Sequence, residues 1–316
     1  MIKWGIIGSG KIARRFAGDL IHAPGAVLAG VSSPRYENAQ KFVSEFGSVA
    51  YKSIPEMLAN VDAVYVASPH TSHSENTLLC FDHKKPVLCE KPFTVNAIQA
   101  ERIFQRAEAQ RLFVMEAMWT RFFPAMEKIL DIVGSGEIGD VVSVESSFGF
   151  QAPFDPSSRI YSLGLAGGSL LDVGVYCVSL ALMLESNTPV EIDAQMELSL
   201  TGVDKTASWT LHFPSGMRAK GSSSVAGTLA NETIVTGSKA EIRIPEFWKP
   251  REFFLGGRHY KFDEPGAGFQ HEAVEVMNCI KTGAIESKKL PWSHTLRTLR
   301  VMDQIRWKCG LVYPAD

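Results

Sequence analysis

Short apolar runs alternate with helix-like patterns over the first 120 residues of the chain. The runs predict strands at Lys3–Ile7, Val27–Ser32, Ala63–Ser68, Pro86–Cys89 and Phe113–Ala117. Between the runs, apolar residues recur at helical spacing, which predicts helices at Ile12–Ile21, Ala39–Glu45, His73–Phe81 and Val95–Ala109. The strands are apolar on both faces, as is typical of parallel strands that helices cover on both sides. The pattern therefore predicts a doubly wound, Rossmann-type parallel sheet over residues 1–120.

After Trp119 the pattern changes to a succession of closely spaced strands with fewer helices. Helices are predicted at Pro124–Gly134, Ser169–Leu184, Phe269–Thr282 and Ser293–Lys308. Strands are predicted at Val141–Phe150, Ile192–Leu200, Thr206–Phe213, Met217–Val225, Glu232–Thr236 and Ala240–Ile244. Short strands separated by turns indicate a large, open, mainly antiparallel sheet. We therefore expect residues 121–316 to form a second domain that binds substrate. An apolar outer face of its sheet would join two copies of the chain as a homodimer, with Trp209 and Leu211 on the same side.

Composition and charge exclude several classes of function. The 316 residues suffice for two domains, and the net charge of -2 comes without a basic patch that would bind nucleic acid. No apolar run has the roughly 20 residues that a membrane span needs, and the N-terminus lacks the pattern of a secretory signal. The five cysteines are scattered within apolar stretches, which is typical of free thiols rather than of zinc ligands. A reducing, cytoplasmic location is expected.

A glycine-rich turn follows the first predicted strand and opens the first predicted helix. It reads Gly8-Ser9-Gly10-Lys11-Ile12-Ala13 and matches the pattern G-x-G-x-x-G/A. In dinucleotide-binding folds the first glycine permits the tight turn, and the second lets the backbone approach a pyrophosphate. The N–H groups at the start of the helix then bind the phosphates. The position of the motif between a strand and a helix predicts a dinucleotide site.

The end of the second predicted strand indicates which dinucleotide binds. An NAD enzyme usually carries an acidic residue there, which would repel the 2′-phosphate of NADP. This chain has Ser33 about 23 residues after Gly10, and Arg35 two residues further on. A hydroxyl and a guanidinium suit a phosphate monoester. NADP(H) is therefore preferred over NAD(H), although Arg35 could also be an ordinary solvated arginine.

Three further motifs carry a family resemblance over nearly the whole chain. They are Cys89-Glu90-Lys91-Pro92, the run Met115-Glu116-Ala117-Met118-Trp119-Thr120-Arg121-Phe122-Phe123-Pro124, and Gly167-Gly168-Ser169-Leu170-Leu171-Asp172-Val173-Gly174-Val175-Tyr176. With the glycine motif, they resemble the Gfo/Idh/MocA oxidoreductase family. Within it, the chain is most similar to the dihydrodiol dehydrogenases and the NADP-dependent D-xylose dehydrogenases. Many sugar and inositol dehydrogenases of the family have His where this chain has Tyr176.

The resemblance implies a catalytic set of Lys91, Asp172 and Tyr176. Hydride transfer needs a group that takes or supplies the hydroxyl proton. A free tyrosine, with a pKa of about 10, is a poor base near neutrality, but a lysine ammonium about 4 Å away favours the phenolate by up to roughly 4 kcal/mol. Asp172 lies four residues before Tyr176 on a predicted helix, so both would project from one face. Asp172 would bind a substrate hydroxyl or share in proton transfer; alone, it could equally be a helix-start acid.

The resemblance also implies the remaining site residues. Trp119, Phe148 and Trp248 match aromatic residues that line the substrate pocket in the dihydrodiol enzymes, although ordinary core positions would suit them too. Arg159 matches an arginine near cofactor and substrate. We expect cofactor contacts from Ser68, Pro69, His70, Glu90 and Lys91. His70 and His73 lack the additional ligands of a zinc site, so no metal is expected.

The leading hypothesis is a reversible, NADP(H)-linked oxidation of a cyclic diol or an aldopyranose. Some members of the family are instead glycosidases that use a bound NAD transiently. A non-catalytic, dinucleotide-sensing protein is a third class, but it would have no need of acid–base residues. The motifs do not identify the physiological substrate.

Overall fold

The computed structural model describes residues 1–316, which form two compact units. Unit 1 contains Met1–Thr94, Ile98–Trp119 and Glu264–Trp292. Unit 2 contains Val95–Ala97, Thr120–Asp263 and Ser293–Asp316. Two segments lie across the expected division at residue 120: Val95–Ala97 packs within unit 2, and Glu264–Trp292 packs within unit 1.

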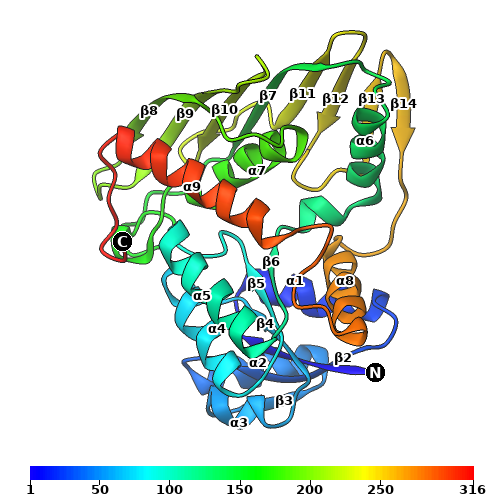
Figure 1. The fold of residues 1–316 in the computed structure, drawn as a ribbon. Coiled ribbons are helices and arrows are strands. Elements are labelled where there is room, and N and C mark those ends of the chain that lie inside the picture. The colour runs from blue at the N-terminus through cyan, green and yellow to red at the C-terminus, as the bar shows by residue number, and fades with distance from the viewer. The chain divides into compact units, whose positions relative to one another are not determined.

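Unit 1 is built on a parallel sheet with the strand order β3-β2-β1-β4-β5-β6. Its strands are β1 (Ile2–Ile7), β2 (Ala26–Ser32), β3 (Val49–Tyr51), β4 (Ala63–Val66), β5 (Val87–Glu90) and β6 (Val114–Ala117). Its helices are α1 (Lys11–Asp19), α2 (Tyr36–Phe46), α3 (Ile54–Leu58), α4 (His73–Asp82), α5 (Ala97–Gln110) and α8 (Phe269–Thr282). Helices lie on both faces of this sheet (Figure 1). The Rossmann prediction is confirmed, but β3 and α3 were missed because three-residue and five-residue elements are too short to show a periodicity.

Helix α8 joins unit 1 through a buried carboxylate on α1. Asp19, the last residue of α1, accepts backbone N–H bonds of 2.8–2.9 Å from Ala267, Gly268 and Phe269. These N–H groups lie at the start of α8, where a helix has no internal acceptors for them. The Asp19 side chain accepts hydrogen bonds from them, and its negative charge interacts favourably with the positive end of the helix dipole. This long-range contact explains why a helix late in the chain packs against the N-terminal sheet.

Unit 2 is built on a mixed sheet with the order β14-β13-β12-β11-β7-β10-β9-β8, in which only the β7–β10 pair is parallel. Its strands are β7 (Val141–Gly149), β8 (Glu191–Leu198), β9 (Asp204–His212), β10 (Arg218–Ser224), β11 (Glu232–Gly237), β12 (Glu241–Pro245), β13 (Glu252–Leu255) and β14 (Arg258–Lys261). Its helices are α6 (Pro124–Gly134), α7 (Val175–Leu184) and α9 (Trp292–Lys308). The mainly antiparallel sheet is confirmed, with β13 and β14 as an additional hairpin.

The two faces of the unit 2 sheet differ in polarity. Helices α7 and α9 lie against one face, and the other face carries no helix (Figure 1). Trp209 and Leu211 do share a side, as expected, but it is the helix-covered side: both are buried, and the Trp209 ring packs on Gly174 and Gly221. The open face carries polar side chains in register, among them Asp193, Thr210, Lys220 and Glu145.

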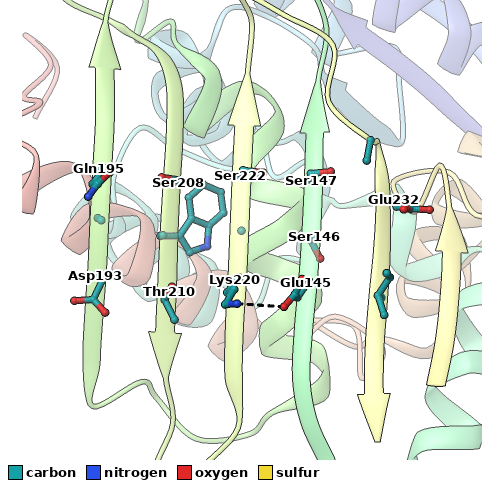
Figure 2. Close-up of a pocket in the computed structure, with 15 residues that line it drawn as sticks. Glu145, Ser146, Ser147, Asp193, Gln195, Ser208, Thr210, Lys220, Ser222 and Glu232 are labelled. Carbon is teal, nitrogen blue, oxygen red and sulfur yellow. Dashed lines mark hydrogen bonds and ion pairs between the residues drawn. The ribbon is translucent and has the colours of Figure 1, made fainter. Parts of the chain in front are cut away.

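The expectation of an apolar outer face is therefore wrong. A shallow hollow of about 650 Å³ lies on this open face, and serine, threonine and charged side chains dominate its lining (Figure 2). Lys220 pairs with Glu145 at 3.3 Å across neighbouring strands. The physical reason is the alternation of side chains along each strand: the apolar set of each strand is already buried under the helices.

The expectation that no apolar run reaches the length of a membrane span is wrong for one segment of unit 2: Leu163–Leu184 is long and apolar enough by length and composition alone. Of its most apolar window, 89% is buried inside the protein, as expected of a core helix.

Candidate active site

The glycine-rich turn in unit 1 has the geometry that a dinucleotide requires. Gly8 has φ +112°, and a Cβ there would lie 2.5 Å from the carbonyl oxygen of Ala67, so only glycine fits. A Cβ at Gly10 would meet no atom within 4 Å. No side chain caps the N-terminus of α1, and its first turn holds no acidic residue. The turn thus offers free N–H groups and open space to a phosphate, which fits the pyrophosphate of a dinucleotide.

The residues around this turn lie as the motif requires. Ala13 is fully buried against the sheet, whereas Lys11 is exposed at the start of α1. The hydroxyl groups of Ser9 and Ser33 lie 3.0 Å apart, so the first turn and the end of β2 meet at a polar point. Arg35 is exposed and precedes α2 directly. The structure therefore brings Ser33 to the glycine turn and leaves the Arg35 side chain at the surface.

Two more groups of predicted residues follow neighbouring strands of the same sheet. Ser68-Pro69-His70 come directly after β4, and Lys91 comes directly after β5. Because β4 and β5 are parallel neighbours, both groups lie at the carboxyl edge of the sheet, where ligands bind in such folds. Lys91 is half-buried, and its bond to Pro92 is cis.

Two buried carboxylates hold the backbone of the Lys91 turn, which we define as residues 91–93. Glu90 accepts the Tyr65 hydroxyl with one oxygen and the Lys91 backbone N–H, at 3.1 Å, with the other. Glu116, at the end of β6, accepts the Phe93 backbone N–H at 3.1 Å. The predicted contact of Glu90 with the cofactor stays a prediction; in the structure its two oxygens accept hydrogen bonds from Tyr65 and Lys91. The hydrogen bond of Glu116 to Phe93 could not be predicted from the sequence, because a single Glu in an apolar strand belongs to no motif.

A buried histidine, His73, was predicted only to start a helix, and it does more. It is the first residue of α4 and is fully buried. Its Nδ1 lies 2.9 Å from the carbonyl oxygen of Pro92, and its Nε2 lies 2.9 Å from that of Ser68. The His73 ring therefore lies between the Lys91 turn and Ser68-Pro69-His70, which we call the Ser68 segment.

In unit 2, Asp172 and Tyr176 lie on one continuous but irregular helix. Residues Leu170–Gly174 form a single π-helical stretch, and α7 continues from Val175. Such π-bulges often occur at functional sites because they shift the side chains out of the regular helical register. Asp172 and Tyr176 are only 5% and 6% exposed. Arg159 binds the Asp172 carboxylate at 3.0 Å, while its own side chain is 53% exposed.

The start of this helix is fixed by Asp204, the first residue of β9. Its Oδ2 accepts the Leu170 backbone N–H at 2.7 Å and the Ser169 hydroxyl at 2.8 Å. Burial raises the pKa of Asp204 to about 6, although these two hydrogen bonds lower it. A Cβ at Gly168 would lie 2.0 Å from the Asp204 carboxylate, so glycine is required there too. The Tyr313 hydroxyl donates to the Gly167 carbonyl at 2.6 Å.

An aromatic cluster adjoins Tyr176 in unit 2. The rings of Phe148 and Trp248 stack with centroids 3.9 Å apart, and Tyr176 lies 5.7 Å from Phe148. The Thr120 hydroxyl donates to the Trp248 carbonyl at 2.6 Å. The structure thus brings together two of the three predicted aromatic residues. Trp119, the third, belongs to unit 1, where it stacks on Phe269 with centroids 4.4 Å apart.

Comparison with known families identifies the two halves of this architecture. Residues 2–118 match the oxidoreductase family with an NAD-binding Rossmann fold, and residues 126–243 match the GFO/IDH/MocA C-terminal domain. The chain belongs to the Gfo/Idh/MocA family of oxidoreductases. The resemblance predicted from the motifs is confirmed, and with it the oxidoreductase class.

Individual relatives cover the whole chain. It is 33% identical to a trans-1,2-dihydrobenzene-1,2-diol dehydrogenase of Mus musculus over 100% of this chain and 99% of the relative. It is also 33% identical to a D-xylose 1-dehydrogenase (NADP(+)) of Hypocrea jecorina over 99% and 93% of the two chains. Among solved structures, a 3-ketoreductase from Actinomadura kijaniata, in complex with NADP and TDP-benzene, matches with a TM-score of 0.87, 25% identity and 98% coverage of both chains.

Proposed function

We propose that this chain is an NADP(H)-dependent dehydrogenase that oxidises a hydroxyl-bearing carbon of a cyclic diol or an aldopyranose. The observation that carries the proposal is the group of Asp172, Tyr176 and the Phe148–Trp248 stack in unit 2. It combines a charged hydrogen-bonding group, a phenol and an aromatic wall. Relatives named for a dihydrodiol and for D-xylose support the two substrate classes.

The residues of unit 2 divide the work of binding and proton transfer. Arg159 compensates the charge of the buried Asp172 carboxylate, so Asp172 acts as a hydrogen-bond acceptor for substrate hydroxyls. The Tyr176 hydroxyl takes the proton from the reacting hydroxyl, and Lys91 supplies the positive charge that favours the phenolate. Phe148 and Trp248 pack against the apolar face of the ring, which suits a cyclohexadiene and a pyranose alike.

The residues of unit 1 fit NADP(H), which accepts and donates the hydride when bound. The glycine turn and the bare N-terminus of α1 hold the pyrophosphate. Ser33 and Arg35 bind the 2′-phosphate, since no acidic residue at the end of β2 repels it. The backbone of Ser68-Pro69-His70 would contact a ribose of the cofactor. A relative named for NADP(+) and a similar structure that contains NADP support this choice.

A spectrophotometric screen tests the function. The purified protein is mixed with NADP+ and with pyranoses, inositols or trans-dihydrodiols, and NADPH absorbance is followed. We expect NADPH to accumulate with at least one dihydrodiol or pyranose, and not with the Tyr176→Phe variant. Release of a sugar from a glycoside without net NADPH formation would instead identify a glycosidase, and binding of NADPH without any turnover would identify a sensor.

We further propose that two copies of the chain pair through the open face of the unit 2 sheet and that the protein is cytoplasmic. The face carries no helix, and the Ser and Thr side chains among the polar residues of its hollow are small, so another flat surface can approach it closely. Ser222 lies in the lining of the hollow on β10. All five cysteines are free, which supports a reducing compartment.

Light scattering at micromolar concentration tests the pairing. We expect a dimer for the wild type and a monomer for Ser222→Arg, because a bulky charge in the middle of the face prevents close approach. Glu108→Arg, on the exposed side of α5, is the control and should remain a dimer. A monomeric wild type would refute the dimer.

A further inference from the structure

His73 is fully buried at the start of α4 and holds two segments that lie far apart in the sequence. On one side, Nδ1 faces the carbonyl oxygen of Pro92 in the Lys91 turn. On the other, Nε2 faces the carbonyl oxygen of Ser68, which begins the segment after β4. Both distances are 2.9 Å, the usual length of a hydrogen bond from nitrogen to oxygen.

The two contacts together need two N–H groups, which is more than a neutral imidazole carries. A carbonyl oxygen only accepts, so each contact needs an N–H on the ring. A neutral imidazole carries one N–H, and an imidazolium carries two. Burial and nearby Lys91 lower the pKa of His73, whereas backbone hydrogen bonds with Pro92, Ser68 and Phe93 raise it, and the net direction is downward. At any moment the neutral ring therefore donates to one of the two turns, and its tautomer decides which.

Other groups fix the rest of the Lys91 turn but leave the Pro92 carbonyl to His73. Glu90 accepts the N–H of Lys91, and Glu116 accepts the N–H of Phe93. On the Ser68 side, Asn76 donates to the Ser68 hydroxyl at 3.0 Å but does not occupy its carbonyl. Two α4 side chains, His73 and Asn76, therefore set the position of the Ser68 segment.

We propose that His73 is a positioning residue for hydride transfer: one neutral tautomer donates from Nδ1 to the Lys91 turn, and the other donates from Nε2 to the cofactor-side Ser68 segment. The inference rests on the proposed function, because it takes Lys91 as the cation of the proton-transfer step and Ser68-Pro69-His70 as a cofactor contact. His73 itself touches neither substrate nor cofactor. Its effect on the two turns is separable, since each ring nitrogen serves one of them.

Two substitutions separate the contacts. The amide nitrogen of Asn lies near the position of a histidine Nδ1, and that of Gln reaches the position of Nε2. His73→Asn therefore keeps the donor to Pro92 and loses the donor to Ser68, and His73→Gln does the reverse. We expect His73→Asn to raise the KM for NADP+ and the Kd for NADPH about tenfold while kcat stays within about threefold.

For His73→Gln we expect the opposite division: kcat falls about tenfold, and the Kd for NADPH stays within about threefold. His73→Leu should lose both. His83→Asn and His83→Gln, at the exposed end of the same helix, are the matched controls and should leave every constant unchanged. Equal losses in KM and kcat for His73→Asn and His73→Gln would overturn the proposal, because a merely structural histidine would affect both constants together.

Two measurements need no turnover and keep the inference distinct from the proposed function. Nuclear magnetic resonance of 15N-labelled protein should show a His73 ring N–H that exchanges slowly with solvent, unlike the ring of exposed His83. A rapidly exchanging His73 ring would overturn the proposal. Titration with NADPH should still separate His73→Asn from His73→Gln if no substrate is oxidised. In that case the proposed function fails while the positioning role stands; equal NADPH affinities in both variants would refute the role itself.

Discussion

The Lys91 turn of unit 1 and the start of the Asp172–Tyr176 helix of unit 2 each place proposed catalytic residues, and they are fixed in different ways. In the Lys91 turn, three side chains each contact one backbone group: Glu90, Glu116 and His73. At the start of the helix, Asp204 alone accepts both the Leu170 N–H and the Ser169 hydroxyl. In the turn, a separate side chain thus holds each backbone group, whereas at the start of the helix one carboxylate accepts two hydrogen bonds, and the Ser169 hydroxyl also lies 2.8 Å from that of Ser223.

The difference has a physical consequence for how each region responds to change. When anchoring is spread, losing one contact leaves the others to hold the backbone. When one buried carboxylate does most of the anchoring, its charge matters as well as its shape. We therefore expect the helix start to depend on pH and on a single residue, and the Lys91 turn to tolerate conservative substitution of its carboxylates.

The largest effect should follow from removing the proposed proton-transfer groups, one from each region. Tyr176→Phe should fold normally and bind NADP(H), yet lose roughly 10²–10⁴ in turnover, the usual size of an acid–base contribution. Lys91→Met should do comparable damage and shift the pH–rate profile. The double variant should cost little more than the worse single one, because residues that act together are not additive.

Steady-state kinetics of the three variants measure this. Full additivity, or a Tyr176→Phe variant within about threefold of the wild type, would show that another group moves the proton, with Asp172 as the first to test. Circular dichroism and NADPH titration serve as controls for folding and cofactor binding.

The second effect concerns the charge of Asp204. Because its folded pKa of about 6 lies above the ordinary value of 3.8, folding favours the protonated form. The stability from this group is complete below pH 3.8 and is lost as pH rises through 6, up to about 3 kcal/mol in total. Asp204→Asn keeps the shape without the charge. The difference in free energy of unfolding between the wild type and Asp204→Asn should therefore shift in favour of the variant between pH 4 and pH 7.

Urea unfolding at several pH values measures that difference, and the other carboxyl groups cancel because both proteins carry them. Asp131→Asn, on the exposed side of α6, is the control and should show no such shift. A constant difference between the wild type and Asp204→Asn over this pH range would show that ionisation of Asp204 does not affect the free energy of unfolding.

A third effect belongs to unit 1 alone, which carries the proposed nucleotide site. NADP(H) should bind at least about tenfold more tightly than NAD(H), or about 1.4 kcal/mol. Ser33→Asp should reverse the preference, because a carboxylate there repels the 2′-phosphate and accepts the ribose hydroxyls. Fluorescence titration with both reduced cofactors measures this. Equal or reversed affinities in the wild type would refute the roles of Ser33 and Arg35.

The smallest effect should come from Glu116→Gln in the Lys91 turn. Glutamine keeps a carbonyl oxygen for the Phe93 N–H, and Glu90 and His73 continue to hold the neighbouring groups. We expect the free energy of unfolding to change by less than about 1 kcal/mol and kcat to stay within about threefold. Chemical unfolding and kinetics check both. A larger loss would mean that the anchoring of the turn is not spread after all.

Local patterns predicted most elements and the motif residues. Helices α6 and α8 coincide with their predicted bounds. The helical period of α6 begins directly after Phe123. That of α8 ends at Gly283, whose φ of +72° suits a glycine after a helix. Strands β3, β13 and β14 were missed, being only three or four residues long. The polarity of the open sheet face was mispredicted because alternation shows that a strand has two faces, but not which one the helices cover.

The amino-acid sequence by itself determined the family, the oxidoreductase class, the two kinds of sheet and the residues of the glycine, Lys91 and Tyr176 motifs. Each of those features follows either from a motif of neighbouring residues or from the period at which apolar residues recur. Only the tertiary structure decided that Asp19 holds α8 in unit 1, that Asp204 fixes the start of the Asp172 helix and that His73 lies between the carbonyls of Ser68 and Pro92. Each of these joins a side chain to backbone groups of another segment of the chain. Buried polar groups must find partners wherever the packing brings them, and no local pattern records which partner that is.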